Sequence, residues 1–226
     1  TTISTQLFKN LPYTMDDFKQ VSTVSFFDLA LLVNSDSPFR SVADLLAYAK
    51  AHPGKLNIGT ISTGSTQNLA ADLFKSMAGI DAQVVPYDSS SQVVTALRGN
   101  QVQAAFEIVP SVIGQIKAKA LIPLAVTGDT RFSGLPDIPT LAESGLQGYE
   151  ATSWNGLSLP RDTPDAVVDA LAKDIALVVA SPDVKKKLLD LGAEAHSSTP
   201  AEMTARVRAD QLKWKAVIDK AGIPRQ

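Results

Sequence analysis

Between residues 26 and 127, short apolar runs alternate with segments of helical periodicity, so that a strand followed by a helix recurs four times. This order, with short connections, is typical of a parallel α/β sheet covered by helices on both faces. It constrains the fold more than any other feature of the chain. The predicted strands span 26–34, 55–59, 82–87, 102–109 and 122–127, and the predicted helices begin after Ser41 and span 65–79, 90–100 and 110–120.

The pattern changes after residue 127. The segment 128–150 is rich in Gly and Pro and predicts an excursion with one short helix at 140–145, followed by a strand at 151–160. Ser-Pro or Thr-Pro pairs, which place a cap before a first-turn proline, then open three predicted helices. These helices span 163–180, 181–191 and 199–221.

The two ends of the chain are expected to form a separate lobe. Residues 1–28 predict mostly helix and loop, and they offer few strands for the C-terminal helices to cover. We therefore expect lobe one to combine 1–28 with 151–226, as a discontinuous and incomplete unit. Lobe two is expected to be a compact α/β ligand-binding unit over 29–150.

Composition excludes several classes of protein. The chain of 226 residues has a net charge of −2, so nothing in its charge favours nucleic acid. It contains no cysteine and only two histidines, which argues against thiol chemistry and against a histidine-based metal site. No apolar run approaches the roughly 18–20 residues of a membrane-spanning helix. We predict no metal, no cofactor and no membrane-embedded segment.

The stretch GTISTGST at 59–66 is nearly a nucleotide-binding loop. Gly59, Gly64 and Thr66 fit the phosphate-loop pattern, but Ser65 occupies the position of the essential lysine. Helix N-termini lined with hydroxyls suit a small anion such as a carboxylate, whereas a triphosphate with magnesium would be poorly neutralised. The alternative is that Ser65 and Ser89–Ser91 only cap helices.

Other residues at the predicted ligand edge carry weaker signals. Glu107 lies near the end of the strand 102–109 and Ser111 at the start of the next helix. A lone carboxylate is weak evidence for a general base, and no nucleophile elbow is present, so we predict no catalytic residue. Trp154 is interpreted either as a core or inter-lobe aromatic residue or as part of a cleft lining.

Four segments in order resemble the tripartite tricarboxylate transporter substrate-binding proteins, the Bug or TctC family. They are LNIGTISTGSTQNLAADLFKSMAGI at 56–80, VVPYDSSSQVVTALRGNQVQAAFEIVPSVIGQIKAKALIPLAVTG at 84–128, LPDIPTLAESGLQGYEATSWNGL at 135–157, and LGAEAHSSTPAEMTARVRADQLKWKAVIDKAGI at 191–223. The resemblance covers essentially the whole chain. No single motif is decisive, but the ordered set is highly specific.

The resemblance implies an α/β protein with the type II periplasmic-binding-protein, or Venus-flytrap, fold. Such proteins hold a small organic acid between two lobes and pass it to membrane permease subunits or to a sensor. The family's serine- and glycine-rich loop matches 60–66, its tyrosine-led loop matches 87–91, and its acidic position matches Glu107. The full set of predicted ligand-binding residues is Thr60, Ser62, Thr63, Gly64, Ser65, Thr66, Tyr87, Ser89, Ser90, Glu107, Ser111 and Trp154.

The sequence departs from the family pattern in two ways. Glu107 replaces the usual aspartate and is one methylene longer, which changes the size of the site. The family's opening strand and glycine-rich loop, near PFxxGG, have no counterpart here, so lobe one is expected to lack its N-terminal strand and helix. We expect the natural protein to carry this segment, preceded by a signal peptide that directs it to the periplasm.

Three functional hypotheses follow from the sequence. The favoured one is a solute-binding protein for a carboxylate, without catalytic activity. The second is an α/β enzyme that acts on a small anionic substrate through Glu107 and the serine loop. The third is a fragment that binds no small ligand and engages a partner protein.

Overall fold

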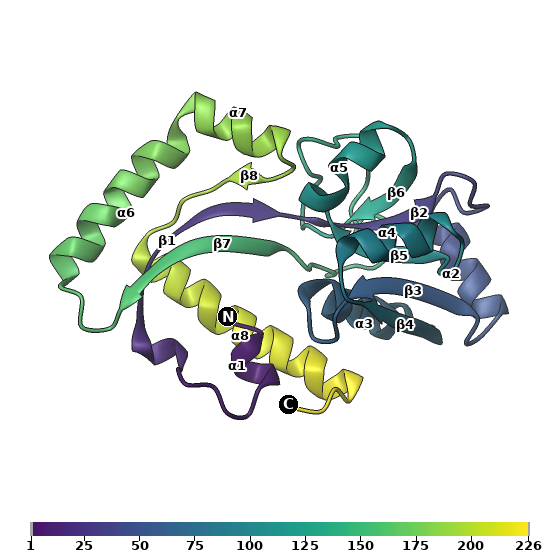
Figure 1. Ribbon diagram of the computed structural model, residues 1–226, viewed down its shortest axis with the longest axis horizontal. Helices are drawn as coiled ribbons and strands as arrows, with labels where there is room; N and C mark the ends of the chain where they lie inside the picture. The colour runs from purple at the N-terminus through teal and green to yellow at the C-terminus, as the bar shows by residue number, and fades with distance from the viewer. Residues whose placement is uncertain (1, 226) are drawn as a thin grey trace. The chain divides into compact units, whose positions relative to one another are not determined.

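The computed structural model describes residues 2–225, which form two compact units (Figure 1). Unit 1 combines Thr1–Phe26 with Trp154–Gln226, and unit 2 is the continuous segment Phe27–Ser153. Each unit has its own β-sheet.

Unit 2 is built on a five-stranded sheet with the order β4-β3-β5-β2-β6. Its strands are β2 (Leu29–Asn34), β3 (Leu56–Ile61), β4 (Ala82–Tyr87), β5 (Ala104–Ile108) and β6 (Leu121–Val126). Its helices are α2 (Val42–Ala51), α3 (Thr66–Ala78), α4 (Ser90–Arg98) and α5 (Val109–Lys117).

The prediction of an entirely parallel sheet is wrong for one strand. β3 pairs in parallel with β4 and β5, but β2 lies between β5 and β6 and runs antiparallel to both. β2 follows directly from a strand of unit 1, so no crossover helix fixes its direction relative to the sheet. The predicted strand 26–34 is also divided at Asp28, because residues up to Phe27 belong to β1 of unit 1's sheet.

The helices of unit 2 begin and end at the signals in the sequence. Ser41, Ser65 and Ser89 cap α2, α3 and α4, each side chain accepting a backbone N–H from the third residue along. α3 ends at Gly79, which has the left-handed conformation (φ 61°) that terminates many helices. The caps of α3 and α4 thus fix where these two helices start, at the edge that carries the predicted ligand loops, whereas α2 follows the antiparallel strand β2 and starts at the opposite end of the sheet.

The helices cover both faces of the sheet. Val93, Ala96 and Leu97 of α4 pack with Val112 and Ile116 of α5 in one buried apolar cluster. On α3, Phe74 makes an edge-to-face contact with Phe106 of β5, with ring centroids 5.7 Å apart. Phe106 lies next along β5 to a residue of the cluster that contains α4 and α5. Successive side chains of a strand point to opposite faces of the sheet, so α3 lies on the opposite face from α4 and α5.

The predicted helix at 140–145 is wrong, since this segment forms turns. Thr140 and Glu143 do make the reciprocal contacts that open a helix: each backbone N–H donates to the other side chain. Gly145, with φ of 105°, ends the structure after this single turn. The segment is held to the sheet by a bridge between Thr140 and Val126.

Unit 1 contains a three-stranded sheet with the order β7-β1-β8. The expectation that residues 1–28 would be mostly helix and loop is wrong, because β1 is a strand of ten residues at Phe18–Phe27. The other strands are β7 (Ser153–Pro160) and β8 (Glu194–Ala195). The helices are α1 (Ser4–Leu7), the 3-10 helix η1 (Met15–Asp17), α6 (Asp165–Ala180), α7 (Pro182–Asp190) and α8 (Pro200–Ala221).

Unit 1 leaves more apolar surface exposed than unit 2. The long helix α8 buries Met203, Val207, Trp214 and Ile218. Large apolar side chains of unit 1 nevertheless remain exposed, whereas Met77 is the one such residue recorded in unit 2. The exposed set in unit 1 is Phe8, Leu157, Val167, Leu177, Val178, Leu189, Leu191 and Leu212.

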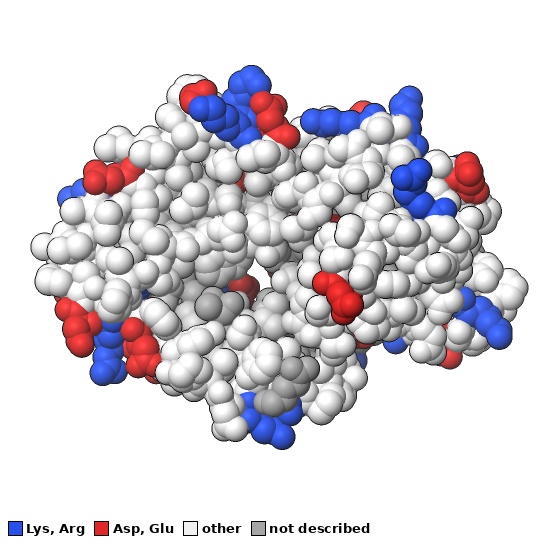
Figure 2. Space-filling view, viewed as in Figure 1, with Lys and Arg blue, Asp and Glu red and all other residues white. Residues whose placement is uncertain are grey.

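Charged side chains of both signs lie interspersed on the face of the molecule shown in Figure 2, most of which is uncharged. This agrees with the net charge of −2. Within residues 2–225, no helix has both the length and the apolar character that a membrane span requires.

Candidate functional site

The candidate site lies at one edge of the sheet in unit 2. β3 and β5 are parallel neighbours, and the chain leaves them in opposite directions: through α3 to β4, and through α5 to β6. Such a switch point is where open α/β sheets bind ligands, beyond the carboxyl ends of the strands. The topology brings the loops after β3 and β4 to this edge together with the end of β5.

The loop between β3 and α3 is held in place by its own backbone. The N–H of Ser62 donates to the carbonyl of Tyr87 at 2.9 Å, which ties the loop to the end of β4. Gly64 has φ of 79°, a left-handed conformation that favours glycine. Ser62 and Thr63 are exposed, so their hydroxyls are accessible from solvent.

Beneath this loop lies a buried polar network. The side chain of Asn68 accepts the N–H of Gly64 at 3.0 Å and donates to the hydroxyl of Thr60 at 3.3 Å. Thr60 is completely buried, and Gln67 and Asn68 are nearly so. Ser65 caps α3 by accepting the N–H of Asn68 at 3.1 Å. The loop geometry therefore depends on side chains in the first turn of α3.

Glu107 lies at the end of β5 and is 0% exposed. Its Oε2 accepts a hydrogen bond from the hydroxyl of Ser90 at 2.9 Å and a longer one from the amide of Gln67 at 3.4 Å. Among the described residues, its Oε1 is buried without a hydrogen-bond partner. Burial raises the pKa of Glu107, and the hydrogen bonds from Ser90, from Gln67 and from the backbone of Ile108 oppose that shift.

The loop after β4 combines capping and packing roles. Ser89 caps α4, and its hydroxyl lies 3.0 Å from that of Ser91. Ser90, the first residue of α4, reaches Glu107 on the neighbouring part of the edge. The ring of Tyr87 packs against the apolar cluster. The alternative interpretation, that these serines only cap helices, is therefore correct for Ser65 and Ser89. The hydroxyl of Ser90 instead donates to Glu107.

Two predicted site residues lie apart from this network. Ser111 is exposed in the first turn of α5, on the same edge of the sheet. Trp154 belongs to β7 of unit 1, and its indole N–H donates to Asp210 at 2.7 Å. Trp154 thus contacts α8 within unit 1.

The loops after β3 and β4 offer many neutral donors and no cationic side chain. Thr66 and Gln67 open α3, and Ser90 and Ser91 open α4, so their backbone N–H groups have no acceptor within the helix. The partial positive charge of both helix N-termini favours an anion there. Residues 59–68 and 87–92 contain no lysine or arginine. This arrangement suits a small anion held by hydrogen bonds.

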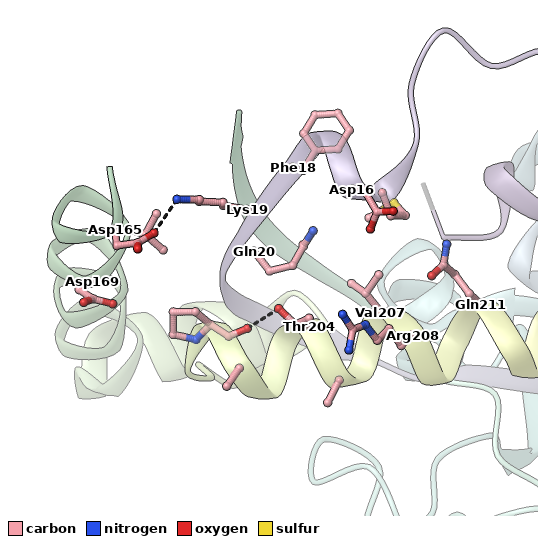
Figure 3. Close-up of a pocket in the computed structure, with 15 residues that line it drawn as sticks. Asp16, Phe18, Lys19, Gln20, Asp165, Asp169, Thr204, Val207, Arg208 and Gln211 are labelled. Atoms are coloured by element: carbon pink, nitrogen blue, oxygen red, sulfur yellow. Dashed lines mark hydrogen bonds and ion pairs between the residues drawn. The ribbon is translucent and has the colours of Figure 1, made fainter. Parts of the chain in front are cut away.

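A hollow of about 680 Å³ lies within unit 1 between η1, β1, α6 and α8 (Figure 3). Lys19 pairs with Asp165 across it, with the charged atoms 2.5 Å apart, while Asp16, Asp169 and Arg208 also line it. With acidic side chains on several sides, this hollow favours an anion less than the edge of unit 2 does. In the described part of the chain, no three His, Asp or Glu side chains group to hold a metal ion.

Sequence analysis missed Gln67 and Asn68. The sequence pattern places both within the predicted helix 65–79 and assigns them no role in the site. Their signal was available, because two amide side chains occupy the first turn of a helix that is otherwise apolar on its buried face. Burial of such side chains requires hydrogen-bond partners, and those partners belong to the loop and to β5.

Comparison with known proteins gives this fold and site their class. The chain resembles an adipate-bound protein from R. palustris at 33% identity and a TM-score of 0.86, over 98% of this chain and 76% of that one. It resembles the periplasmic binding protein BugD at 27% identity and a TM-score of 0.83, over 100% of this chain and 76% of that one. The fold is therefore that of the periplasmic binding proteins.

The family follows from the sequence itself. The model of the tripartite tricarboxylate transporter family receptor (TctC) matches residues 1–223, and the chain belongs to this family. The UPF0065 protein of the tcbD–tcbE intergenic region of Pseudomonas sp. (strain P51) is 33% identical over 93% of this chain. BugT of Bordetella pertussis is 27% identical over 97% of it.

Membership confirms the resemblance that the sequence predicted. The family is one of transporter receptors and BugD is a periplasmic binding protein, so the hypothesis of an α/β enzyme is set aside. The chain spans 63% of the length of the Pseudomonas relative and 68% of BugT.

Proposed function

We propose that the chain acts in the periplasm as a solute-binding protein that captures a small organic acid. The acid would pass to the permease subunits of a tripartite tricarboxylate-type transporter or to a sensor. One observation carries this proposal: two helix N-termini and a set of hydroxyls converge at the switch point of unit 2 without a lysine or arginine. The expected closure of two lobes over the acid stays a prediction.

The relatives support a carboxylate as the ligand. The R. palustris protein at 33% identity was solved with adipate, a dicarboxylate. The match to the family model extends over residues 1–223, so it includes all the loops described above. A dicarboxylate of this kind is therefore the first ligand to test.

A thermal-shift screen tests the proposal. The chain is screened against mono-, di- and tricarboxylates, aromatic acids and amino acids, with Mg-ATP as the control. A ligand at about 100 times its dissociation constant adds about 2.7 kcal/mol to the free energy of unfolding, which is a readable shift. We expect a shift with one class of carboxylate and none with Mg-ATP.

Variants locate the site. Ser62→Ala combined with Thr63→Ala removes two exposed hydroxyls of the loop and leaves its backbone contacts in place. Loss of a hydrogen bond to a charged ligand costs about 1.5–3 kcal/mol, so we expect affinity to fall at least tenfold. Thr95→Ala, one turn into α4 from Ser91, is the matched control and should bind normally.

Two results would contradict the proposal. Turnover of an acid in a mass-spectrometric assay would restore the enzyme hypothesis. Absence of any shift, both for this chain and for a chain extended to the length of its curated relatives, would favour the hypothesis of a protein that binds only a partner.

A further inference from the structure

Glu107 is placed unusually for a carboxyl group beneath an anion site. It is fully buried, and the two side-chain donors that reach it, Ser90 and Gln67, contact the same oxygen. The backbone N–H of Ile108 also favours the charged form. In the described part of the chain, the other oxygen, Oε1, has no hydrogen-bond partner. A buried ionised carboxylate needs donors at both oxygens, so the observed contacts satisfy only half of the charged form.

The uncharged acid fits this environment better. Gln67 donates through its amide nitrogen to Oε2, so Oε1 is the oxygen that would carry the proton of a neutral acid. An unpaired hydroxyl in a buried site costs much less than an unpaired negative charge. The direction of the pKa shift agrees, because burial is its largest cause.

The charged groups of the surrounding elements do not compensate the carboxylate. Asp28 lies two residues before Ala30, which pairs with Glu107 across β2 and β5. β2, β3, β4 and β6 contain no ionisable side chain other than the phenol of Tyr87. The helices that adjoin Glu107 carry Asp72 and Lys75 on α3, Arg98 at the end of α4 and Lys117 at the end of α5. The adjoining loops carry Asp81, Asp88, Lys119, Asp129 and Arg131. None of them is among the causes of the shift at Glu107.

Resting on the function proposed above, we propose that Glu107 is a positioning residue that stays protonated while the organic acid is bound. The complex therefore contains both the anion of the ligand and the proton on Glu107. A neutral Glu107 anchors Ser90 and Gln67 beneath the loops without placing a negative charge under the bound anion. Because no negative charge then opposes the ligand, we expect the site to bind organic acids in their ionised form.

Linkage sets the sign of the pH dependence. A bound anion disfavours ionisation of Glu107, so its pKa is higher in the complex than in the free protein. Affinity is therefore full at a pH below the free-state pKa and falls as the pH rises through it, by up to tenfold per pH unit. In that range, binding takes up as much as one proton for each acid bound.

Calorimetry tests this inference, with adipate as the first probe. The complete chain is titrated between pH 6 and 9, in buffers of different ionisation enthalpy so that proton uptake is measured directly. We expect affinity to fall at least tenfold across this range, with net proton uptake. Glu107→Gln should bind with the same affinity at every pH, and Glu107→Asp should recover the dependence.

A control variant at another acidic residue and an NMR titration of Glu107 without ligand complete the test. Asp88→Asn removes an exposed acid beside the same loop, and it should leave the pH dependence unchanged. The carboxyl carbon of Glu107, assigned by NMR from the spectrum of Glu107→Gln, should titrate above the ordinary range for glutamate without any ligand.

Several outcomes overturn the inference. It is wrong if the NMR resonance of Glu107 titrates at about the ordinary value of 4.3. It is also wrong if adipate binds with equal affinity at every pH, or if Glu107→Gln keeps the dependence of the native chain. By contrast, failure of every acid to bind, together with a high titration of Glu107, would count against the proposed function alone.

Discussion

Asn68 organises the loop that forms the centre of the candidate site. Its side chain uses both halves of the amide: the oxygen holds the N–H of Gly64 and the nitrogen holds the hydroxyl of Thr60. Both contacts are buried. Since the backbone of Gly64 is left-handed, the loop has few alternative ways to satisfy that N–H group.

Replacement of Asn68 by alanine should therefore lower stability as well as ligand affinity. Asn68→Ala leaves a buried N–H and a buried hydroxyl without partners, and we expect a loss of about 2–4 kcal/mol in the free energy of unfolding. Urea denaturation measures it. Gln92→Ala is the control, because its amide oxygen accepts the exposed N–H of Asp88, which water can replace. Equal losses for the two variants would show that the network is not structural.

Single residues also explain which serines serve the site. The hydroxyls of Ser65 and Ser89 cap helices, whereas Ser62 and Thr63 remain exposed on the loop. The spacing of the serines predicted that hydroxyls would gather here. It did not distinguish caps from exposed groups, because that division depends on the exact residue at which each helix begins.

At the scale of the elements, unit 1 depends on a close approach between α8 and its sheet. A Cβ atom added to Gly156 of β7 would lie 2.6 Å from the terminal carbon of Met203 on α8. It would also lie 2.9 Å from the backbone carbonyl of Ser22 on β1. The methionine can move aside, but the carbonyl belongs to the strand itself.

Gly156→Ala should therefore separate β7 from its neighbours and destabilise the chain. Overpacking of this kind typically costs about 1–3 kcal/mol, and the midpoint of urea denaturation reports it. Gly114→Ala provides the opposite expectation, since that position on α5 has open space around it and alanine favours a helix by about 0.5–1 kcal/mol. A stable Gly156→Ala chain would mean that the sheet of unit 1 accommodates the methyl group.

At the scale of the whole molecule, the two units differ in how they are built. Unit 2 is one continuous segment with its own five-stranded sheet and apolar core. Unit 1 is assembled from both ends of the chain and leaves most of the exposed large apolar side chains. A continuous segment with its own core satisfies the physical definition of a domain.

The isolated segment 27–153 should therefore fold by itself. We expect a cooperative thermal transition by circular dichroism and a dispersed amide NMR spectrum. A shorter segment, 27–118, is the control: it lacks β6, which pairs with β2 and contributes Leu121 and Val126 to the core. If 27–153 is unfolded while the whole chain folds cooperatively, unit 2 depends on unit 1 for its stability.

The sequence by itself determined the elements of unit 2 and its place in a family. Strand–helix alternation, serine caps and closing glycines predicted α2 to α5 to within a few residues, because caps and periodicity are local properties of the chain. The same alternation placed the serine loops and Glu107 at one edge, since the carboxyl ends of parallel strands share an edge.

Only the tertiary structure decided the direction of β2, the existence of β1 and the contacts of Glu107. β1 escaped prediction because its buried Ser22 and Thr23 look polar in the sequence, yet Thr23 donates to the carbonyl of His196 from the far end of the chain. Gln67 and Ser90 meet Glu107 from elements that are separated by 40 and 17 residues. Such partners are chosen by packing and hydrogen bonding across the fold, which local sequence patterns do not encode.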